Sequence, residues 1–179
     1  MRPCLFLMIL SIASNSLYAY SGFSVCNHGN ETLSSVMCDG PSVLKQTQIT
    51  GDMNIAGTLQ ADGISVTSMK VIGETRIANA TVRGSVNVVG DLSASHVVFS
   101  KGIAIQSNNI LLNHTTVDGL VIVTSPDKTP YVQIQCGSDV KGSVMFDGKA
   151  GVVQITGDSI LRGKVVNGST EFVKRDCSE

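Results

Sequence analysis

The side chains in this sequence that best suit catalysis, by type and spacing, are the acidic residues that directly follow a glycine. Asp52, Glu74 and Asp91 all stand in this position, and Asp158 repeats it near the C-terminus. Carboxylates brought together from neighbouring segments can act as a general acid and a general base. A turn uses the same residues differently, because a turn aspartate accepts hydrogen bonds from its own backbone. We expect the turn role and keep a small polysaccharide-active enzyme as an alternative.

Motifs of the common enzyme classes do not occur in the sequence. There is no Gly-x-Ser-x-Gly elbow, no His-Glu-x-x-His zinc motif and no phosphate-binding loop. The histidines have no partner at a fixed spacing, so we expect surface positions for His28, His96 and His114. A calcium loop could begin at Asp52, but Ala56 and Gly63 occupy ligand positions. We therefore expect no catalytic activity, no cofactor and no metal.

Cysteines provide the other reactive groups. Cys4 lies in an N-terminal leader, which leaves Cys26, Cys38, Cys136 and Cys177, an even number. Four cysteines allow three pairings. Proximity in the sequence favours Cys26 with Cys38 and leaves Cys136 for Cys177. Free buried thiols are the alternative, because Cys136 continues an alternating apolar pattern.

The N-terminus has the pattern of a secretory signal peptide. Arg2 precedes an apolar run from Cys4 to Ile12, and cleavage is expected after Ala19. An uncleaved anchor is the alternative, but the run is shorter than the roughly 20 residues of a spanning helix. We therefore expect an exported protein, in the periplasm, on the cell surface or outside the cell, with no integral membrane insertion after cleavage.

The net charge of the chain, which is close to zero, argues against binding to nucleic acid. The chain carries 13 Lys and Arg against 14 Asp and Glu, and removal of the leader takes only Arg2 from these charges. A nucleic-acid-binding surface needs clustered basic side chains. We expect no nucleic acid, and a glycan or another component of the cell envelope is a candidate partner.

Short apolar alternations dominate the sequence from Ile49 to Val166. They form about a dozen bursts of three to five residues, separated by Gly, Asn or Asp, with no helical i, i+3, i+4 stripe. Hydrophobic residues make up 42% of the chain but aromatic residues only 4%, so Val, Ile, Leu and Ala must build the core. This pattern predicts an all-β protein.

Turn residues recur at a fixed spacing that favours a β-helix. Gly51, Gly57 and Gly63 stand six residues apart, as do Gly84 and Gly90, and six residues make one side of a three-sided coil. The apolar-x-Gly-Asp sequence occurs three times, ending at Asp52, Asp91 and Asp158, the last with Gly157. The glycines are expected at corners that need a positive φ. An ordinary sandwich of seven to nine strands is the alternative, but its turns would lie eight to twelve residues apart.

The chain divides by pattern into four parts. Residues 1–19 form the signal peptide, 20–46 an N-terminal cap that contains the Cys26–Cys38 bridge, 47–168 a β-helix of about six rungs and 169–179 a C-terminal tail. Residues Ser125–Pro130 break the rhythm and are expected to form a loop. Each end of a β-helix presents unpaired backbone groups, so an uncapped end would associate with another chain.

Two stretches resemble the bactofilins, polymer-forming bacterial proteins with a β-helical core. They are Gln48-Ile-Thr-Gly-Asp-Met-Asn-Ile-Ala-Gly57 and Ala80-Thr-Val-Arg-Gly-Ser-Val-Asn-Val-Val-Gly-Asp-Leu-Ser-Ala-Ser-His-Val-Val-Phe99. The resemblance covers residues 47 to 124 and 150 to 168. It implies the coil architecture and a tendency to associate end to end. Bactofilins lack a cleaved signal peptide and disulfides, so this chain departs from them in both respects.

Three functions follow from these features. The first is an exported structural or interaction protein that associates through a coil end or a flat face. The second is a carbohydrate-binding module or adhesin that uses a long face of the helix. The third is the small β-helix enzyme, with its carboxylates supplied by Asp52, Glu74 and Asp91.

Overall fold

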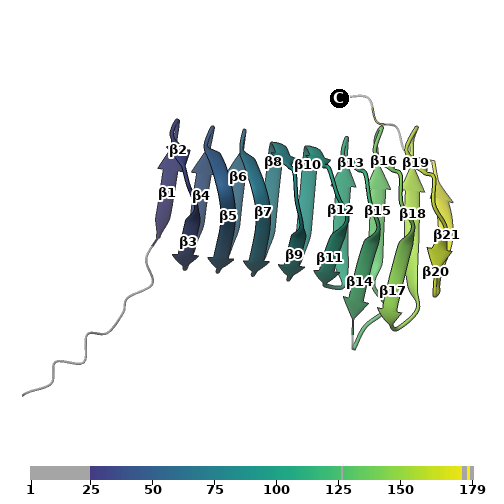
Figure 1. Cartoon of the computed structure of the whole chain (residues 1–179). Helices are drawn as coiled ribbons and strands as arrows, with labels where there is room; N and C mark the ends of the chain where they lie inside the picture. Colours follow the sequence, from purple (N-terminus) through teal and green to yellow (C-terminus); the bar gives the residue numbers. More distant parts are fainter. Residues whose placement is uncertain (1–24, 126, 175–176, 178–179) are drawn as a thin grey trace, which may run out of the picture.

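The chain folds into a β-solenoid, which a computed structural model describes for residues 25–125, 127–174 and 177 (Figure 1). Its described strands pair in parallel throughout. The all-β prediction and the solenoid prediction are therefore confirmed, and the hairpin-linked sandwich is wrong. No helix long and apolar enough to span a membrane occurs in the described ranges. The expected leader, residues 1–19, lies outside them.

Three faces, which we call A, B and C, surround the core in the order in which the chain visits them. Face A contains β1 (Cys26–Gly29), β4 (Ser42–Lys45), β6 (Leu59–Asp62), the first halves of β8 (Thr75–Val82) and β10 (Leu92–Phe99), β12 (Asn109–Asn113), β15 (Tyr131–Gln135), β18 (Gly151–Thr156) and β21 (Gly168–Val173).

Faces B and C are built in the same way from the rest of each turn. Face B contains β2 (Thr32–Leu33), the first halves of β5 (Gln48–Ala56) and β7 (Ser65–Ile72), the second halves of β8 and β10, β13 (Thr116–Val117), β16 (Asp139–Val140) and β19 (Ile160–Leu161). Face C contains β3 (Val36–Asp39), the second halves of β5 and β7, β9 (Val86–Val89), β11 (Ile103–Gln106), β14 (Val121–Ser125), β17 (Val144–Gly148) and β20 (Val165–Val166).

The solenoid is longer than the sequence pattern predicted. Face A has strands at nine levels, so the chain makes about nine turns instead of about six rungs. Most of the difference lies at the ends, because the segment 20–46 contains the strands β1 to β4 and the segment 169–179 contains most of β21. The N-terminal cap with its disulfide is present, but it is the first coil itself. Both end coils carry polar or exposed residues, which hid their strands in the sequence.

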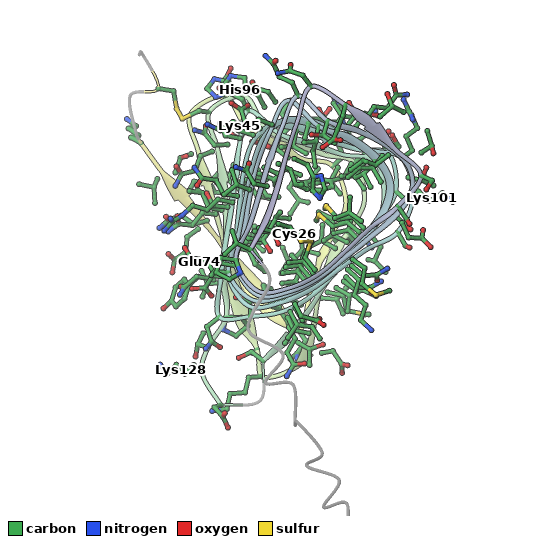
Figure 2. The ribbon with its side chains drawn as sticks, turned by 90° about the vertical axis from the view of Figure 1, so that its left-hand side faces the viewer. Cys26, Lys45, Glu74, His96, Lys101 and Lys128 are labelled. Atoms are coloured by element: carbon green, nitrogen blue, oxygen red, sulfur yellow. A yellow bond between two sulfur atoms is a disulfide. The ribbon has the colours of Figure 1, made fainter. Side chains whose placement is uncertain are left out.

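The core is made of columns, in which the inward side chains at one position of successive coils stack along the axis. One column on face A runs His28, Leu44, Ala61, Ile77, Ala94, Leu112, Ile134, Ile155 and Phe172. From Leu44 to Ile155 every member is buried. Figure 2, which views the solenoid from its N-terminal end, shows side chains of successive coils stacked inside the ribbon. Small aliphatic side chains suit the narrow interior, and their burial stabilises the fold by about 25 cal/mol per Å².

The corner between faces A and B has a left-handed backbone at nearly every turn. Residues with positive φ stand there at each level, and most are not glycine: Asn30, Gln46, Gly63, Asn79, His96, His114, Cys136 and Gly157. Asparagine tolerates this conformation better than most residues. The expected positive φ is thus found at Gly63 and Gly157, and also at Gly57 and Gly90 on another corner.

Gly51 and Gly84 are corner glycines for a different reason than the one expected. They do not have a positive φ. A Cβ on Gly51 would lie 2.5 Å from the Ser34 carbonyl oxygen, and one on Gly84 would lie 2.6 Å from that of Thr67. At this corner, between faces B and C, neighbouring coils approach so closely that only a residue without a side chain fits.

The three apolar-x-Gly-Asp sequences lie at three different corners. Gly51 lies between faces B and C, Gly90 between C and A, and Gly157 between A and B. The motif therefore marks a corner and not a whole repeat. A full turn takes 16 or 17 residues near the N-terminus, since Leu59 pairs with both Ser42 and Thr75.

Candidate functional site

The three carboxylates proposed from the sequence do not form one site. Asp52 lies at the corner between faces B and C, where the Ser68 hydroxyl donates a hydrogen bond to it. Glu74 and Asp91 lie one coil apart at the corner where face A begins, because the residues that follow them, Thr75 and Leu92, are paired. The structure thus brings two of the three together and separates Asp52 from them.

Glu74 and Asp91 already have partners in the protein. Arg76 makes an ion pair with Glu74, with 2.6 Å between Nη2 and Oε1. The Ser107 hydroxyl donates to Asp91 Oδ1 over 2.7 Å. Asp91 therefore links two successive coils at their corner, which is the role of a turn residue.

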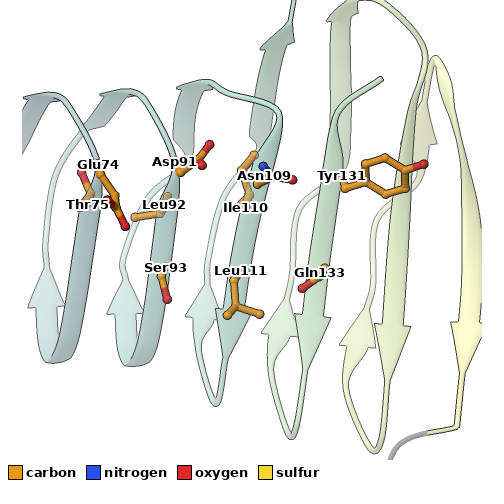
Figure 3. A pocket seen from close by; sticks show the side chains of 10 residues that line it. All are labelled: Glu74, Thr75, Asp91, Leu92, Ser93, Asn109, Ile110, Leu111, Tyr131 and Gln133. Carbon is orange, nitrogen blue, oxygen red and sulfur yellow. The ribbon is translucent and has the colours of Figure 1, made fainter. Parts of the chain in front are cut away.

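A groove of about 270 Å³ crosses four coils at this corner (Figure 3). Its outer row contains Glu74, Asp91, Asn109 and Tyr131, one residue from each coil. Its floor and far side are Thr75, Leu92, Ser93, Ile110, Leu111 and Gln133. The side chains belong to, or directly precede, β8, β10, β12 and β15, whose parallel pairing fixes their spacing at about 4.8 Å per coil. A stacked sheet therefore holds this polar row rigidly.

Tyr131 owes its position to the loop that precedes it. The chain leaves face C at the end of β14 and returns to face A at β15, and residues 127–130 between them form no strand, as the expected loop requires, whereas Ser125 belongs to β14. Ser125 is 1% exposed, and its hydroxyl donates to the Lys128 carbonyl over 2.7 Å. Lys149 donates to the Asp127 carbonyl from the next turn. These contacts fasten the loop on both sides, and the Tyr131 backbone N–H bonds to the Asn108 carbonyl over 2.8 Å.

Both disulfides expected from proximity are present. Cys26 and Cys38 join face A to face C across the first coil, with their Cα atoms 6.1 Å apart. Cys136 and Cys177 bind the C-terminal segment to the corner after β15, with a Cα separation of 5.4 Å. The pattern is that of bridges which fasten the two ends of a solenoid. It also agrees with an oxidising compartment.

Two histidines that looked isolated in the sequence are neighbours in the structure. The rings of His96 and His114 stack with centroids 4.6 Å apart and planes 3° from parallel. Both occupy the left-handed corner, one coil apart. His28, the third, pairs with Glu31 over 2.8 Å. Sequence spacing missed these contacts because the length of the intervening turn sets the register.

Metal-binding groups are not assembled in the described ranges. No three His, Cys, Asp or Glu side chains there lie close enough to hold an ion. Stacked parallel rings such as those of His96 and His114 also direct their nitrogen lone pairs side by side and not toward one point.

One ion pair near the C-terminal end perturbs an acid. Arg162 forms a forked hydrogen bond with Asp139, with its Nε and Nη2 donating to the carboxylate over 2.9 and 2.8 Å. This hydrogen bond lowers the pKa of Asp139 below its usual value, and the charges of Arg162 and Lys141 act in the same direction. The pair connects β16 to the last turn on face B.

The two ends of the solenoid differ in what they expose. At the N-terminal end, the disulfide and the His28–Glu31 pair stand at the edge of the core. At the C-terminal end, Phe172 occupies a core column, directly beyond Ile155, and is 80% exposed. Among the described residues, β21 pairs only with β18. The last coil thus presents an apolar ring and a free strand edge.

Comparison with protein-family models, curated proteins and solved structures found no match. The class of protein is therefore defined by the fold alone, a disulfide-bonded β-solenoid.

Proposed function

We propose that this protein is an exported structural or interaction protein whose rigid solenoid associates through its C-terminal coil. One observation carries the proposal: Phe172 lies in a core column but is 80% exposed. Burying such a side chain is worth about 1.5–3 kcal/mol, and a free strand edge adds unpaired backbone groups that a partner can satisfy.

The asymmetry of the ends favours a dimer over a filament. A filament needs two complementary ends, whereas here the first coil, among the described residues, also has an unpaired strand edge but carries the His28–Glu31 pair and a disulfide where the last coil carries Phe172. A single open end pairs with its own copy about a two-fold axis, which gives a closed dimer. The two copies of β21 would then run antiparallel, with the two Phe172 rings in the interface.

Export is supported by two independent features. The N-terminal residues have the charge and apolar run of a signal peptide, and four cysteines form two bridges. Expression of the full chain in a bacterial host should give a periplasmic protein that begins at Tyr20 and has no alkylatable thiol. N-terminal sequencing and mass spectrometry measure both, and a cytoplasmic, reduced, uncleaved product would contradict export.

Kinship with the bactofilins remains part of this proposal. The properties that we expect this chain to share with the bactofilins are the coil architecture and end-to-end association. No family model matches the chain, so the support for this kinship is the coil geometry. Two bridges and a leader would make this an exported relative of a polymer-forming protein, with one end closed.

Sedimentation analysis over a range of concentrations tests the association. The wild type should form dimers, and Phe172→Asp should be a monomer. Met37→Asp is the matched control, because Met37 is 81% exposed on β3 of the first coil and should leave the dimer intact. A wild type that stays monomeric at its highest soluble concentration, or a Phe172→Asp dimer, would overturn the proposal.

The positions and contacts of the three carboxylates do not support the enzyme alternative. Asp52 lies on a different corner from Glu74 and Asp91, and each of the three has a partner within the protein.

A further inference from the structure

The groove on face A combines side chains that suit one class of ligand. Tyr131 presents an aromatic ring that is 44% exposed at one end. The amide of Gln133 lies on the same strand as Tyr131, and the Asn109 amide and the Asp91 carboxylate lie on the two preceding coils. Aromatic rings pack against apolar ring faces, while carboxylates and amides bond to hydroxyl groups as acceptors or donors. A sugar ring has both an apolar face of C–H groups and a rim of hydroxyls.

The charge of the residues that line the groove favours neutral sugars over anionic ones. The described residues that line the groove include two acids, Glu74 and Asp91, and no lysine or arginine. Arg76 stands beside the groove but is paired with Glu74 over 2.6 Å. An anionic polymer would therefore meet like charge, which costs binding free energy.

The groove is also formed before any ligand arrives. Its floor is a stacked sheet, with Leu92 and Ile110 buried beneath it. Tyr131 follows the fastened loop, and Pro130 beside it is buried and accepts a backbone hydrogen bond from Val152 over 2.9 Å. Preorganised side chains lose little conformational entropy on binding, so even a shallow site can be selective.

A second hollow extends the polar surface around the same corner. It is lined by Val89, Gly90, Asp91, Gln106, Ser107, Asn108, Thr124, Ser125 and Asp127. Asp91 belongs to both hollows. The second hollow adds hydroxyl, amide and carboxylate groups next to Asp91.

We infer that this corner is a binding site for a neutral oligosaccharide, which stacks one ring on Tyr131 and extends its hydroxyls along Gln133, Asn109 and Asp91. The site lies at the corner between faces C and A, on β8 to β15, away from the last coil. It is therefore independent of the proposed association through Phe172.

Titration with cellohexaose, xylohexaose and chitohexaose tests the site, with hexagalacturonate as the anionic comparison. The chain has no tryptophan, and after cleavage at Ala19 it keeps only Tyr20 and Tyr131, so tyrosine fluorescence reports directly on the groove. At least one neutral hexasaccharide should bind and change this signal, and hexagalacturonate should not. Calorimetry gives the affinity independently of the fluorescence.

Matched variants locate the ligand. Tyr131→Ala should weaken binding by at least about tenfold, and Tyr131→Phe, which keeps the ring, should weaken it far less. Gln133→Ala should weaken binding by about 2–10-fold, the effect of one hydrogen bond. Gln154→Ala is the control, because Gln154 pairs with Gln133 on the next coil but does not line the groove.

Several outcomes would overturn the inference. They are no binding of any of the three neutral hexasaccharides, equal binding by Tyr131→Ala, or tighter binding of hexagalacturonate. Phe172→Asp should bind sugar as the wild type does. Failure of the dimer with intact sugar binding would thus count against the proposed function alone, and the reverse result against the groove alone.

Discussion

The first and last coils of this solenoid differ in the side chains that they place where the core meets solvent. Each has a core column that ends at a solvent boundary, with His28 at one end and Phe172 at the other. His28 pairs with Glu31, and the Cys26–Cys38 bridge spans the same coil. No described strand pairs with β21 on the side away from β18, and Phe172 is 80% exposed. The N-terminal end thus places polar groups and a disulfide at the solvent boundary, whereas the C-terminal end exposes an aromatic ring there.

The comparison shows that a column position does not by itself define a core residue. Ile134 and Phe172 belong to one column, but only Ile134 has a coil on either side. Burial, and with it the contribution to stability, depends on the coils that flank a residue.

The largest loss of stability should come from truncating a side chain in the middle of this column, and not one at its end. Ile134 is fully buried, so Ile134→Ala should lower the free energy of unfolding by about 2–5 kcal/mol. Phe172→Ala, measured on the monomer, should lower it by less than about 0.5 kcal/mol. Urea unfolding followed by circular dichroism measures both. Similar losses at the two positions would mean that the last coil is covered.

Removal of the first bridge should open the closed end. Cys26→Ser with Cys38→Ser removes a cross-link across 12 residues, which is worth about 3 kcal/mol in the chain-entropy model. Hydrogen exchange should then accelerate in β1 to β3 and stay slow in β12 and β15. Uniform acceleration over all coils would instead indicate that the bridge supports the whole solenoid and is not a local cap.

An apolar N-terminal end should change the mode of association. His28→Leu with Glu31→Leu replaces a polar side-chain pair that is 31% and 41% exposed, so the monomer should lose less than about 1 kcal/mol. With both ends apolar, the protein should form chains longer than dimers, visible by electron microscopy. Dimers alone would show that the disulfide, and not the polar pair, closes this end.

The smallest effect should come from the ion pair that holds the last turn. Asp139→Asn should lower stability by less than about 1 kcal/mol, because Arg162 is 56% exposed. The folded-state pKa of Asp139 is lowered, so its contribution is present above the unfolded pKa and lost as pH falls through the folded one. The difference between wild type and variant should therefore be greatest above about pH 5 and vanish in strong acid. A difference that grows on acidification would contradict this linkage.

Local patterns in the sequence predicted the features that depend on neighbouring residues. Alternation of apolar and small polar residues identified the strands, and the spacing of Gly51, Gly57 and Gly63 gave the three successive corners of one coil. Proximity predicted the Cys26–Cys38 pair correctly. A loop was correctly expected after β14, where residues 127–130 form no strand.

Features that join one coil to the next could not be predicted in this way. A turn takes 16 or 17 residues near Leu59 but 22 between Ile110 and Val132, where the loop is inserted. The register between coils therefore drifts, so the stacking of His96 on His114 was missed, as was the extension of the Glu74–Asp91 row to Asn109 and Tyr131. The sequence signal for the histidine stack is the positive-φ corner. Glycine and asparagine indicate such a corner in a sequence, but histidine does not.

The sequence by itself determined that this chain is an all-β solenoid with small aliphatic side chains inside and two bridges, because strand alternation, corner glycines and paired cysteines act over short distances. Only the tertiary structure decided the number of coils, the closed and open ends and the polar groove. These depend on which residues become neighbours about one turn apart, and the length of each turn sets that outcome.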